Sequence, residues 1–405
     1  MRLHHFIKMM TKVVLIMVVM LRCCSGLSMN YYMMSCPMAE FIIKNSVNSA
    51  LRNDPTLAAG LIRMHFHDCF IEGCDASVLL DSTDGNTAEK DSPANLSLRG
   101  YEVIDDAKEQ LENQCPGIVS CADIVAMAAR DAVFFSGGPV YDIPKGRKDG
   151  TRSKIEDTRN LPPPFFNSTE LINMFGQKGF TAQEMVALSG GHTLGVARCS
   201  AFKNRLKNFD STHDVDPSMD TQFMKTLAKT CSAGDDAEQP FDTSRNSFDN
   251  FYFNALQRRS GVLLSDQTLM ADPKTRPIVN GYAMNQAMFF FDFQRAMVKM
   301  GLLDVKETGQ IRKRMAAARD RQKSYADKRR KPLEFQVWVL LFHLVFTFPR
   351  EFRSTARIPS HFYDRYLAEF EFLGFPVHDL YRFLNEVQLF VDLYLLKRYN
   401  KCFIG

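Results

Sequence analysis

The sequence lacks an apolar run long enough to cross a bilayer as a helix. Residues 13–21 and 337–348 are apolar, but both runs are shorter than the roughly 20 residues that a span requires. Net charge is also low, at +4 over 405 residues, and gives no reason to expect a nucleic-acid partner. Alternating apolar and polar residues, the pattern of a half-buried strand, are scarce. We therefore expect a mostly helical globular protein with no membrane or nucleic-acid partner.

The N-terminus has the pattern of a secretory signal peptide. Arg2 and Lys8 precede the apolar run, and the small residues Ser25 and Gly26 follow it. A basic start, a short apolar stretch and small residues at the cleavage point are typical of a segment removed on secretion; a buried N-terminal helix is the alternative. We expect residues 1–26 to be the signal and the mature protein to reach the extracellular space and cell wall, or the vacuole.

Secretion decides how the ten cysteines are interpreted. In an oxidising compartment they are disulfide candidates before they are metal ligands. Cys23 and Cys24 leave with the signal, and Cys402 lies near the C-terminal end. The others are odd in number, so one of them has no partner among them: Cys36, Cys69, Cys74, Cys115, Cys121, Cys199 and Cys231.

Apolar residues at helical spacing indicate that the body of the chain is mostly helical. Thr181 and Glu184 form a capping box that opens a helix at residues 182–188, and Gly190 and Gly191 are expected to end it. The other helices are predicted at residues 41–51, 57–70, 101–111, 124–135, 251–256, 275–282 and 286–300.

Arg63 and His67 lie four residues apart on one predicted helix, so they share a face. A neutral histidine can move a proton from one peroxide oxygen to the other. A fixed guanidinium can stabilise the negative charge that grows as the O–O bond breaks. The pair therefore suits peroxide cleavage, although a surface arginine beside a core histidine is the alternative for the pair alone.

Hard oxygen donors follow this pair in a tight loop that Cys69 and Cys74 flank and could close as a short disulfide. Carboxylates, a hydroxyl and backbone carbonyls could together supply the six or more oxygens that calcium takes. An acidic surface turn is the alternative. The candidate ligands are Asp68, Ile71, Gly73, Asp75 and Ser77.

As a whole, residues 63–77 resemble the distal-site signature of secretory plant (class III) haem peroxidases. The resemblance implies an all-α haem peroxidase fold of about ten or more helices, with haem b between a distal and a proximal half and very little strand. It implies a monomeric enzyme that reduces hydrogen peroxide and oxidises small phenolic donors by one-electron steps. It makes Arg63 and His67 the distal pair, places Phe66 at the haem pocket, and makes the loop oxygens a first calcium site.

A second segment supplies a candidate for the axial ligand of the haem iron. His192 follows Gly190 and Gly191, which allow the backbone to approach a flat macrocycle closely, and the segment resembles the family's proximal motif. Asp266 matches the carboxylate that binds the other nitrogen of that histidine and makes the imidazole more electron-rich; a helix cap is the alternative role for Asp266.

The resemblance assigns further residues. Asn95 matches the acceptor of the distal histidine N–H, and Glu89 lies between the distal pocket and the calcium loop. Pro162 matches the donor-binding stretch at the haem edge, with a plain loop stiffener as the alternative. A second calcium ion is implied at Thr193, Asp242, Ser244 and Asp249, with Thr243 and Ser244 left as alternatives.

Two sequons are present, at Asn95 and Asn167. Because a sugar on Asn95 would block the site, Asn167 is the better glycosylation acceptor.

The resemblance also implies three disulfides, Cys36–Cys115, Cys69–Cys74 and Cys199–Cys231. The sequence departs from the family at Cys121, whose usual partner would follow the stretch Gly309-Gln310-Ile311-Arg312 and is missing there. The partner of Cys121 is then either Cys402 or none.

The resemblance ends near Arg312. We expect a peroxidase domain at residues 27–314 and a tail at residues 315–405 that is foreign to the family, disordered or loosely helical. Part of the tail resembles a retrotransposon polyprotein fragment. Two alternatives remain: a secreted, disulfide-stapled calcium-binding scaffold without haem, and a chimera that the tail and Cys121 leave inactive.

Overall fold

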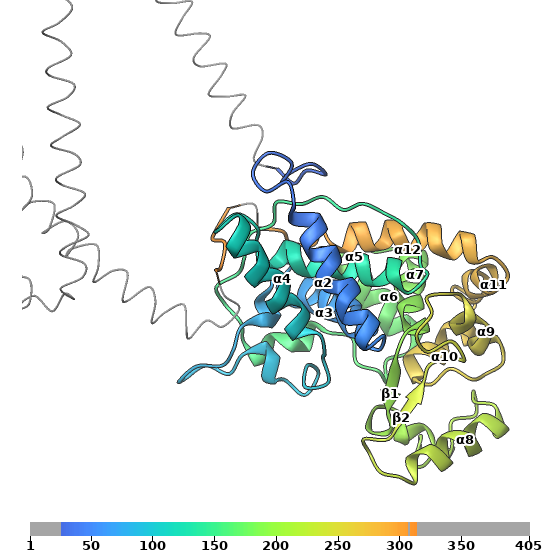
Figure 1. Cartoon of the computed structure of the whole chain (residues 1–405). Coiled ribbons are helices and arrows are strands. Elements are labelled where there is room, and N and C mark those ends of the chain that lie inside the picture. The colour runs from blue at the N-terminus through green and yellow to red at the C-terminus, as the bar shows by residue number, and fades with distance from the viewer. Residues whose placement is uncertain (1–25, 307, 314–405) are drawn as a thin grey trace, which may run out of the picture. The chain divides into compact units, whose positions relative to one another are not determined.

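The computed structural model describes residues 26–306 and 308–313. This part of the chain forms eleven α-helices and one antiparallel sheet of two short strands (Figure 1). The prediction of an all-α fold with very little strand is confirmed. Most of the expected signal and the whole expected tail lie outside the described residues. None of the described helices is long and apolar enough to span a membrane.

Four helices form one half of the molecule. They are α2 (Ala39–Asn53), α3 (Leu57–Ile71), α4 (Tyr101–Gln114) and α5 (Cys121–Phe135). Helix α5 packs against α2, α3 and α4, and its residues are buried from Cys121 to Val133 because apolar side chains occupy every face. The hydroxyl of Ser120 caps α5 by accepting the Asp123 N–H at 3.1 Å. The central helix thus holds α3, which carries Arg63 and His67.

The second half contains α6 (Ser168–Gln177), α7 (Ala182–Ser189), α9 (Phe251–Gln257), α10 (Leu264–Ala271), α11 (Arg276–Met284) and α12 (Gln286–Met300). Helix α12 packs on α7 and α11 packs on α9. Phenylalanine rings fill the space between them; Phe289 lies 4.9 Å from Phe253, centroid to centroid. The capping box of Thr181 and Glu184 is present as predicted.

A smaller lobe contains α8 (Thr221–Cys231) and the strands β1 (Val196–Arg198) and β2 (Glu238–Pro240). In the sheet, Val196 pairs with Pro240 and Arg198 with Glu238. The lobe has a core of its own, which includes Phe202, Leu227 and Phe241.

Helices α6, α8 and α10 were not among the helices that the sequence predicts. Caps begin the first two: Asn167 accepts the Glu170 N–H at 3.0 Å, and Asp220 accepts that of Phe223 at 2.9 Å. Gly190 does end α7, but the chain continues through a 3-10 turn, η4 (Gly190–Thr193). That turn carries His192.

Three disulfides join Cys36 to Cys115, Cys69 to Cys74 and Cys199 to Cys231, the pairs that the resemblance implies. Cys121 is buried at the start of α5, and its sulfur lies 4.0 Å from the carbonyl oxygen of Arg312. Cys402 lies outside the described residues.

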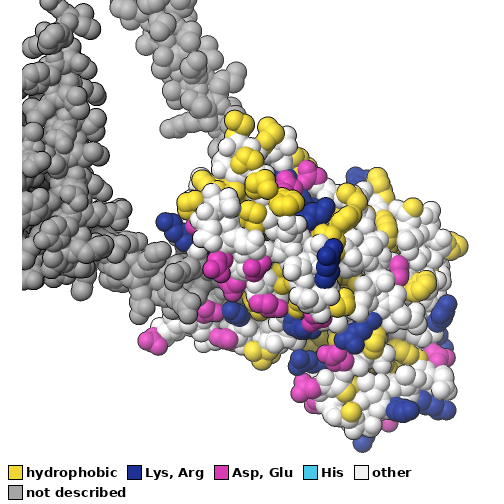
Figure 2. Space-filling view, in the orientation of Figure 1, with side chains coloured by type: hydrophobic (Ala, Val, Ile, Leu, Met, Phe, Trp, Pro, Cys, Tyr) yellow, Lys and Arg dark blue, Asp and Glu magenta, His cyan; other side chains and the backbone are white. Residues whose placement is uncertain are grey.

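Lysine, arginine and acidic side chains are interspersed over the face drawn in Figure 2. Apolar side chains gather near the start of α2, where Met34 is 88% exposed on the preceding turn.

Candidate active site

Helix α3 presents Arg63 and His67 together. The Arg63 Nε–H donates to His67 Nε2 at 3.1 Å, while its two terminal nitrogens donate to the Ser97 hydroxyl and the Ala94 carbonyl, both at 2.8 Å. The guanidinium is therefore fixed at three points. Since Nε2 accepts a hydrogen bond, the proton of a neutral His67 is on Nδ1.

Asn95 holds the other side of this imidazole. His67 Nδ1 lies 2.5 Å from Asn95 Oδ1, and Asn95 Nδ2 donates to the Glu89 carbonyl at 2.8 Å. Asn95 is 1% exposed. Because both ends of its amide are engaged inside the protein, a glycan on Asn95 is incompatible with this fold.

Burial keeps His67 neutral. It lowers the pKa of His67 to about 3, and the charge of Arg63 acts in the same direction. Burial also lowers the pKa of Arg63 to about 10, which still leaves the guanidinium charged at neutral pH. The site thus combines an available base with a fixed cation.

His192 stands on the η4 turn with a buried carboxylate behind it. Its Nδ1 donates to Asp266 Oδ1 at 2.8 Å, and the same oxygen accepts the Tyr252 hydroxyl at 2.9 Å. The His192 side chain is 40% exposed and that of Asp266 is 2% exposed. Within the described residues nothing hydrogen-bonds to His192 Nε2, so this nitrogen is available to a ligand.

Asp266 fills both roles considered from the sequence. Its Oδ2 accepts the Leu263 N–H at 3.1 Å at the start of α10, while Oδ1 holds His192. The sequence did not predict two residues that contact this pair. Tyr252 shares Asp266, and the ring of Phe241 stacks on that of His192 with centroids 4.4 Å apart and planes 2° from parallel. Neither has a local signal, because each contact joins separate elements.

The two halves meet close to these histidines. Helix α3 contacts the η4 turn. A side chain at Gly191 would meet Ile62 of α3, and a Cβ at Gly195, whose φ is +89°, would lie 2.7 Å from that of Ala59. Only glycine permits so close an approach at positive φ. The chain just after His192 thus packs closely on the helix that carries His67.

These residues fit a haem group. One imidazole has a free Nε2 and a carboxylate partner on Nδ1, and a carboxylate in this place usually orients a histidine that binds a metal. The other imidazole is neutral and lies beside a fixed guanidinium. Phe66 packs edge-on to His67 with centroids 5.8 Å apart. Pro162 is half-buried, and its loop is joined to α10 because the Ser265 N–H donates to the Pro164 carbonyl at 3.1 Å.

The residues expected at the first calcium site bring buried carboxylate oxygens together. Asp68, Asp75, Ser77 and Glu89 are all 0% exposed. Asp68 Oδ1 and Glu89 Oε1 have no hydrogen-bond partner among the described residues. Burial raises the pKa of Asp68 well above its usual value and that of Glu89 to about 8. A bound divalent ion would offset this cost of burying carboxylates.

The residues expected at the second calcium site lie close together. The Thr193 hydroxyl lies 2.8 Å from Asp242 Oδ2 and 3.2 Å from Asp249 Oδ1. The Ser244 hydroxyl lies 3.0 Å from each of these aspartates, whereas Thr243 is exposed. Ser244, rather than Thr243, therefore lies among the other expected ligands. No three His, Cys, Asp or Glu side chains in the described ranges are placed to share one metal ion, and each expected ligand set contains only two carboxylates.

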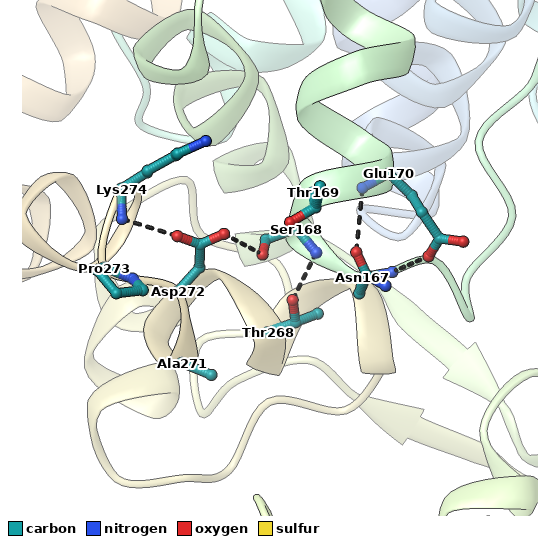
Figure 3. A pocket seen from close by; sticks show the side chains of 9 residues that line it. All are labelled: Asn167, Ser168, Thr169, Glu170, Thr268, Ala271, Asp272, Pro273 and Lys274. Carbon is teal, nitrogen blue, oxygen red and sulfur yellow. Dashed lines mark hydrogen bonds between the residues drawn. The ribbon is translucent and has the colours of Figure 1, made fainter.

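An open surface pocket of about 720 Å³ lies apart from these residues, between the start of α6 and the end of α10 (Figure 3). Asn167, Ser168, Thr268 and Asp272 are among the residues that line it. It contains none of the expected haem or calcium residues. Asn167, the expected glycosylation acceptor, is exposed and lies at the edge of this pocket.

Comparison with known proteins identifies the class. The peroxidase family model matches residues 43–285, and the chain belongs to the class III plant peroxidases. It is similar to Peroxidase 47 of Arabidopsis thaliana, with 74% identity over 289 residues, 71% of this chain and 87% of the relative. Peroxidase 66 of Arabidopsis thaliana is 51% identical, over 71% of this chain and 91% of the relative. Peroxidase 5 of Vitis vinifera is 50% identical, over 71% and 89%. The protein is a peroxidase, and the haem-free scaffold is not favoured.

Proposed function

We propose that this peroxidase is a secreted enzyme that binds haem b between His67 and His192, reduces hydrogen peroxide and oxidises small phenolic donors. One peroxide and two donor molecules would give two waters and two donor radicals. The observation that carries the proposal is the neutral His67, hydrogen-bonded to Asn95 and beside the fixed guanidinium of Arg63.

The proton chemistry follows from these contacts. His67 Nε2 is placed to take the proton from the nearer peroxide oxygen and to return it to the oxygen that departs as water. Asn95 keeps the other proton of the ring on Nδ1. Arg63 stabilises the negative charge on the departing oxygen.

The proximal residues would hold the cofactor. His192 Nε2 would bind the iron, and Asp266 would orient the ring and increase its electron density. Haem, when bound, supplies the two-electron reduction of peroxide and the one-electron oxidation of donors. Pro162 is proposed to contact donors through its carbonyl at the exposed edge.

Two calcium ions would fix the segments on either side of the haem. The first would bind Asp68, Asp75 and Ser77 with the carbonyls of Ile71 and Gly73. The second would bind Thr193, Asp242, Ser244 and Asp249. Both ligand sets adjoin a site histidine in sequence, at Asp68 and Thr193, so their role is to hold the geometry.

The same proposal includes the domain limits. Residues 1–26 would be removed on secretion, and residues 27–314 would form the peroxidase domain. The protein would act as a monomer in the extracellular space or cell wall, or in the vacuole.

Substitution of the distal pair tests the assignment. The variants His67→Leu and Arg63→Leu should each retain a Soret band and lose roughly 10²-fold or more in the rate of reaction with peroxide. His213→Gln, at an exposed histidine, is the control and should react normally. A full rate in His67→Leu would refute the role of His67, and the absence of a Soret band in the unaltered protein would refute haem binding.

A further inference from the structure

Residues 303–306 and 308–312 lie against the loop that carries the first expected calcium ligands. The Cys74 N–H donates to the Leu303 carbonyl at 3.1 Å, and the Arg312 guanidinium donates to the Ala76 carbonyl at 2.6 Å. Between these contacts, the Lys306 ammonium donates to Asp75 Oδ2. The C-terminal part of the domain therefore places the flexible side chain of Lys306 against the Asp75 carboxylate of the loop.

Lys306 binds the one loop carboxylate whose two oxygens are both engaged. Asp75 Oδ1 accepts the Ser77 N–H at 3.0 Å, and Oδ2 accepts Lys306. In contrast, Asp68 Oδ1 and Glu89 Oε1 have no hydrogen-bond partner in the described part of the chain. Asp68 and Glu89 thus each have one oxygen without a partner, whereas both oxygens of Asp75 already accept a hydrogen bond.

An ammonium and a calcium ion would repel each other beside this carboxylate. An ammonium carries three donors and no lone pair, so it cannot be a calcium ligand. Both groups are positive, and both would lie beside the same buried side chain. We propose that Lys306 competes with calcium for Asp75 and thereby lowers the calcium affinity of the loop. The proposal rests on the calcium site proposed above.

The exchange needs only a side-chain rotation. The Lys306 side chain is 39% exposed, whereas that of Asp75 is fully buried. The backbone of Lys306 is held, because its carbonyl accepts the Lys148 N–H at 2.8 Å. A lysine has a flexible four-carbon stem, so calcium binding would move the ammonium into solvent while the segment stays in place.

Calcium titration of the full-length holoenzyme after EGTA treatment tests the competition. Titrations are done in an Asp249→Asn background, which weakens the second expected site. We expect Lys306→Met to bind calcium at least about tenfold more tightly, the scale of one charge-assisted hydrogen bond. Lys306→Arg keeps the charge and should stay close to the parent, as should the control Lys148→Met, whose ammonium contacts Tyr31 rather than the loop.

Amine acetylation read by mass spectrometry gives an independent measurement in the unaltered protein. Calcium should raise the reactivity of Lys306 several-fold and leave that of the buried Lys145 unchanged. Equal calcium affinity in Lys306→Met and the parent, or an unchanged Lys306 reactivity with calcium bound, would overturn the proposal. A protein that binds no calcium would refute the calcium site as well, while its Soret band and turnover would still report the peroxidase.

Discussion

Asp266→Asn is a sharp test of the proximal site because three donors converge on this carboxylate. Oδ1 accepts from His192 Nδ1 at 2.8 Å and from the Tyr252 hydroxyl at 2.9 Å. Oδ2 accepts the Leu263 N–H at 3.1 Å. An asparagine has the same shape but offers one acceptor oxygen and an NH₂ group. Whichever way the amide turns, its NH₂ faces a donor.

The size of the effect follows from the burial of the group. Asp266 is 1% exposed, so water cannot replace the lost acceptor. A buried donor left without a partner costs about 1–3 kcal/mol. At about 2–4 °C per kcal/mol for a domain of this size class, the melting temperature should fall by about 2–12 °C. If the NH₂ faces His192, the ring proton must move to Nε2, and the proposed binding of iron by this nitrogen would be weakened.

Thermal unfolding by circular dichroism and the intensity of the Soret band measure these two effects separately. Tyr252→Phe removes one donor and should cost less, about 0.5–1.5 kcal/mol. Asp220→Asn is the matched control, because asparagine caps a helix as well as aspartate does and Asp220 caps α8. An Asp266→Asn protein with the parent's melting temperature and Soret band would refute the reasoning.

Three further predictions concern pH, calcium and glycosylation. Burial lowers the pKa of His67 to about 3, against about 6.5 in an unfolded chain. The stability linked to His67 is therefore complete above about pH 6.5 and is lost as the pH falls toward 3, because only the unfolded chain binds this proton. Urea unfolding across that range should show a flatter pH dependence for His67→Gln, and equal slopes would contradict the prediction. EGTA should lower the melting temperature, because calcium at 100 times its Kd stabilises the folded state by about 2.7 kcal/mol. Asp68→Asn should make this fall in melting temperature smaller. If magnesium alone restored the melting temperature, the result would argue against a calcium site. Thr169→Ala should remove the N-glycan on Asn167 from protein secreted by plant cells, and Thr169→Ser should keep it. A glycan found on Asn95 by peptide mapping would contradict the fold.

Local relations were readable from the sequence because helix geometry fixes them. The four-residue spacing of Arg63 and His67 placed them on one face, and the structure joins them by a hydrogen bond. The capping box of Thr181 and Glu184 is likewise contained within one turn. Helices whose apolar pattern is short were missed; α8, for example, buries fully only Leu227. Its start depends on a cap at Asp220 rather than on a long apolar stripe.

The sequence by itself determined the helical class, the order of the motifs and the residue types of the site. Only the tertiary structure decided which of them touch. Asp266 accepts hydrogen bonds from both Tyr252 and His192, although His192 and Asp266 are 74 positions apart in the sequence. Lys306 contacts Asp75, which is 231 positions away. The physical reason is that a periodic pattern specifies which face of an element is buried, whereas the partner across that face depends on how separate elements pack.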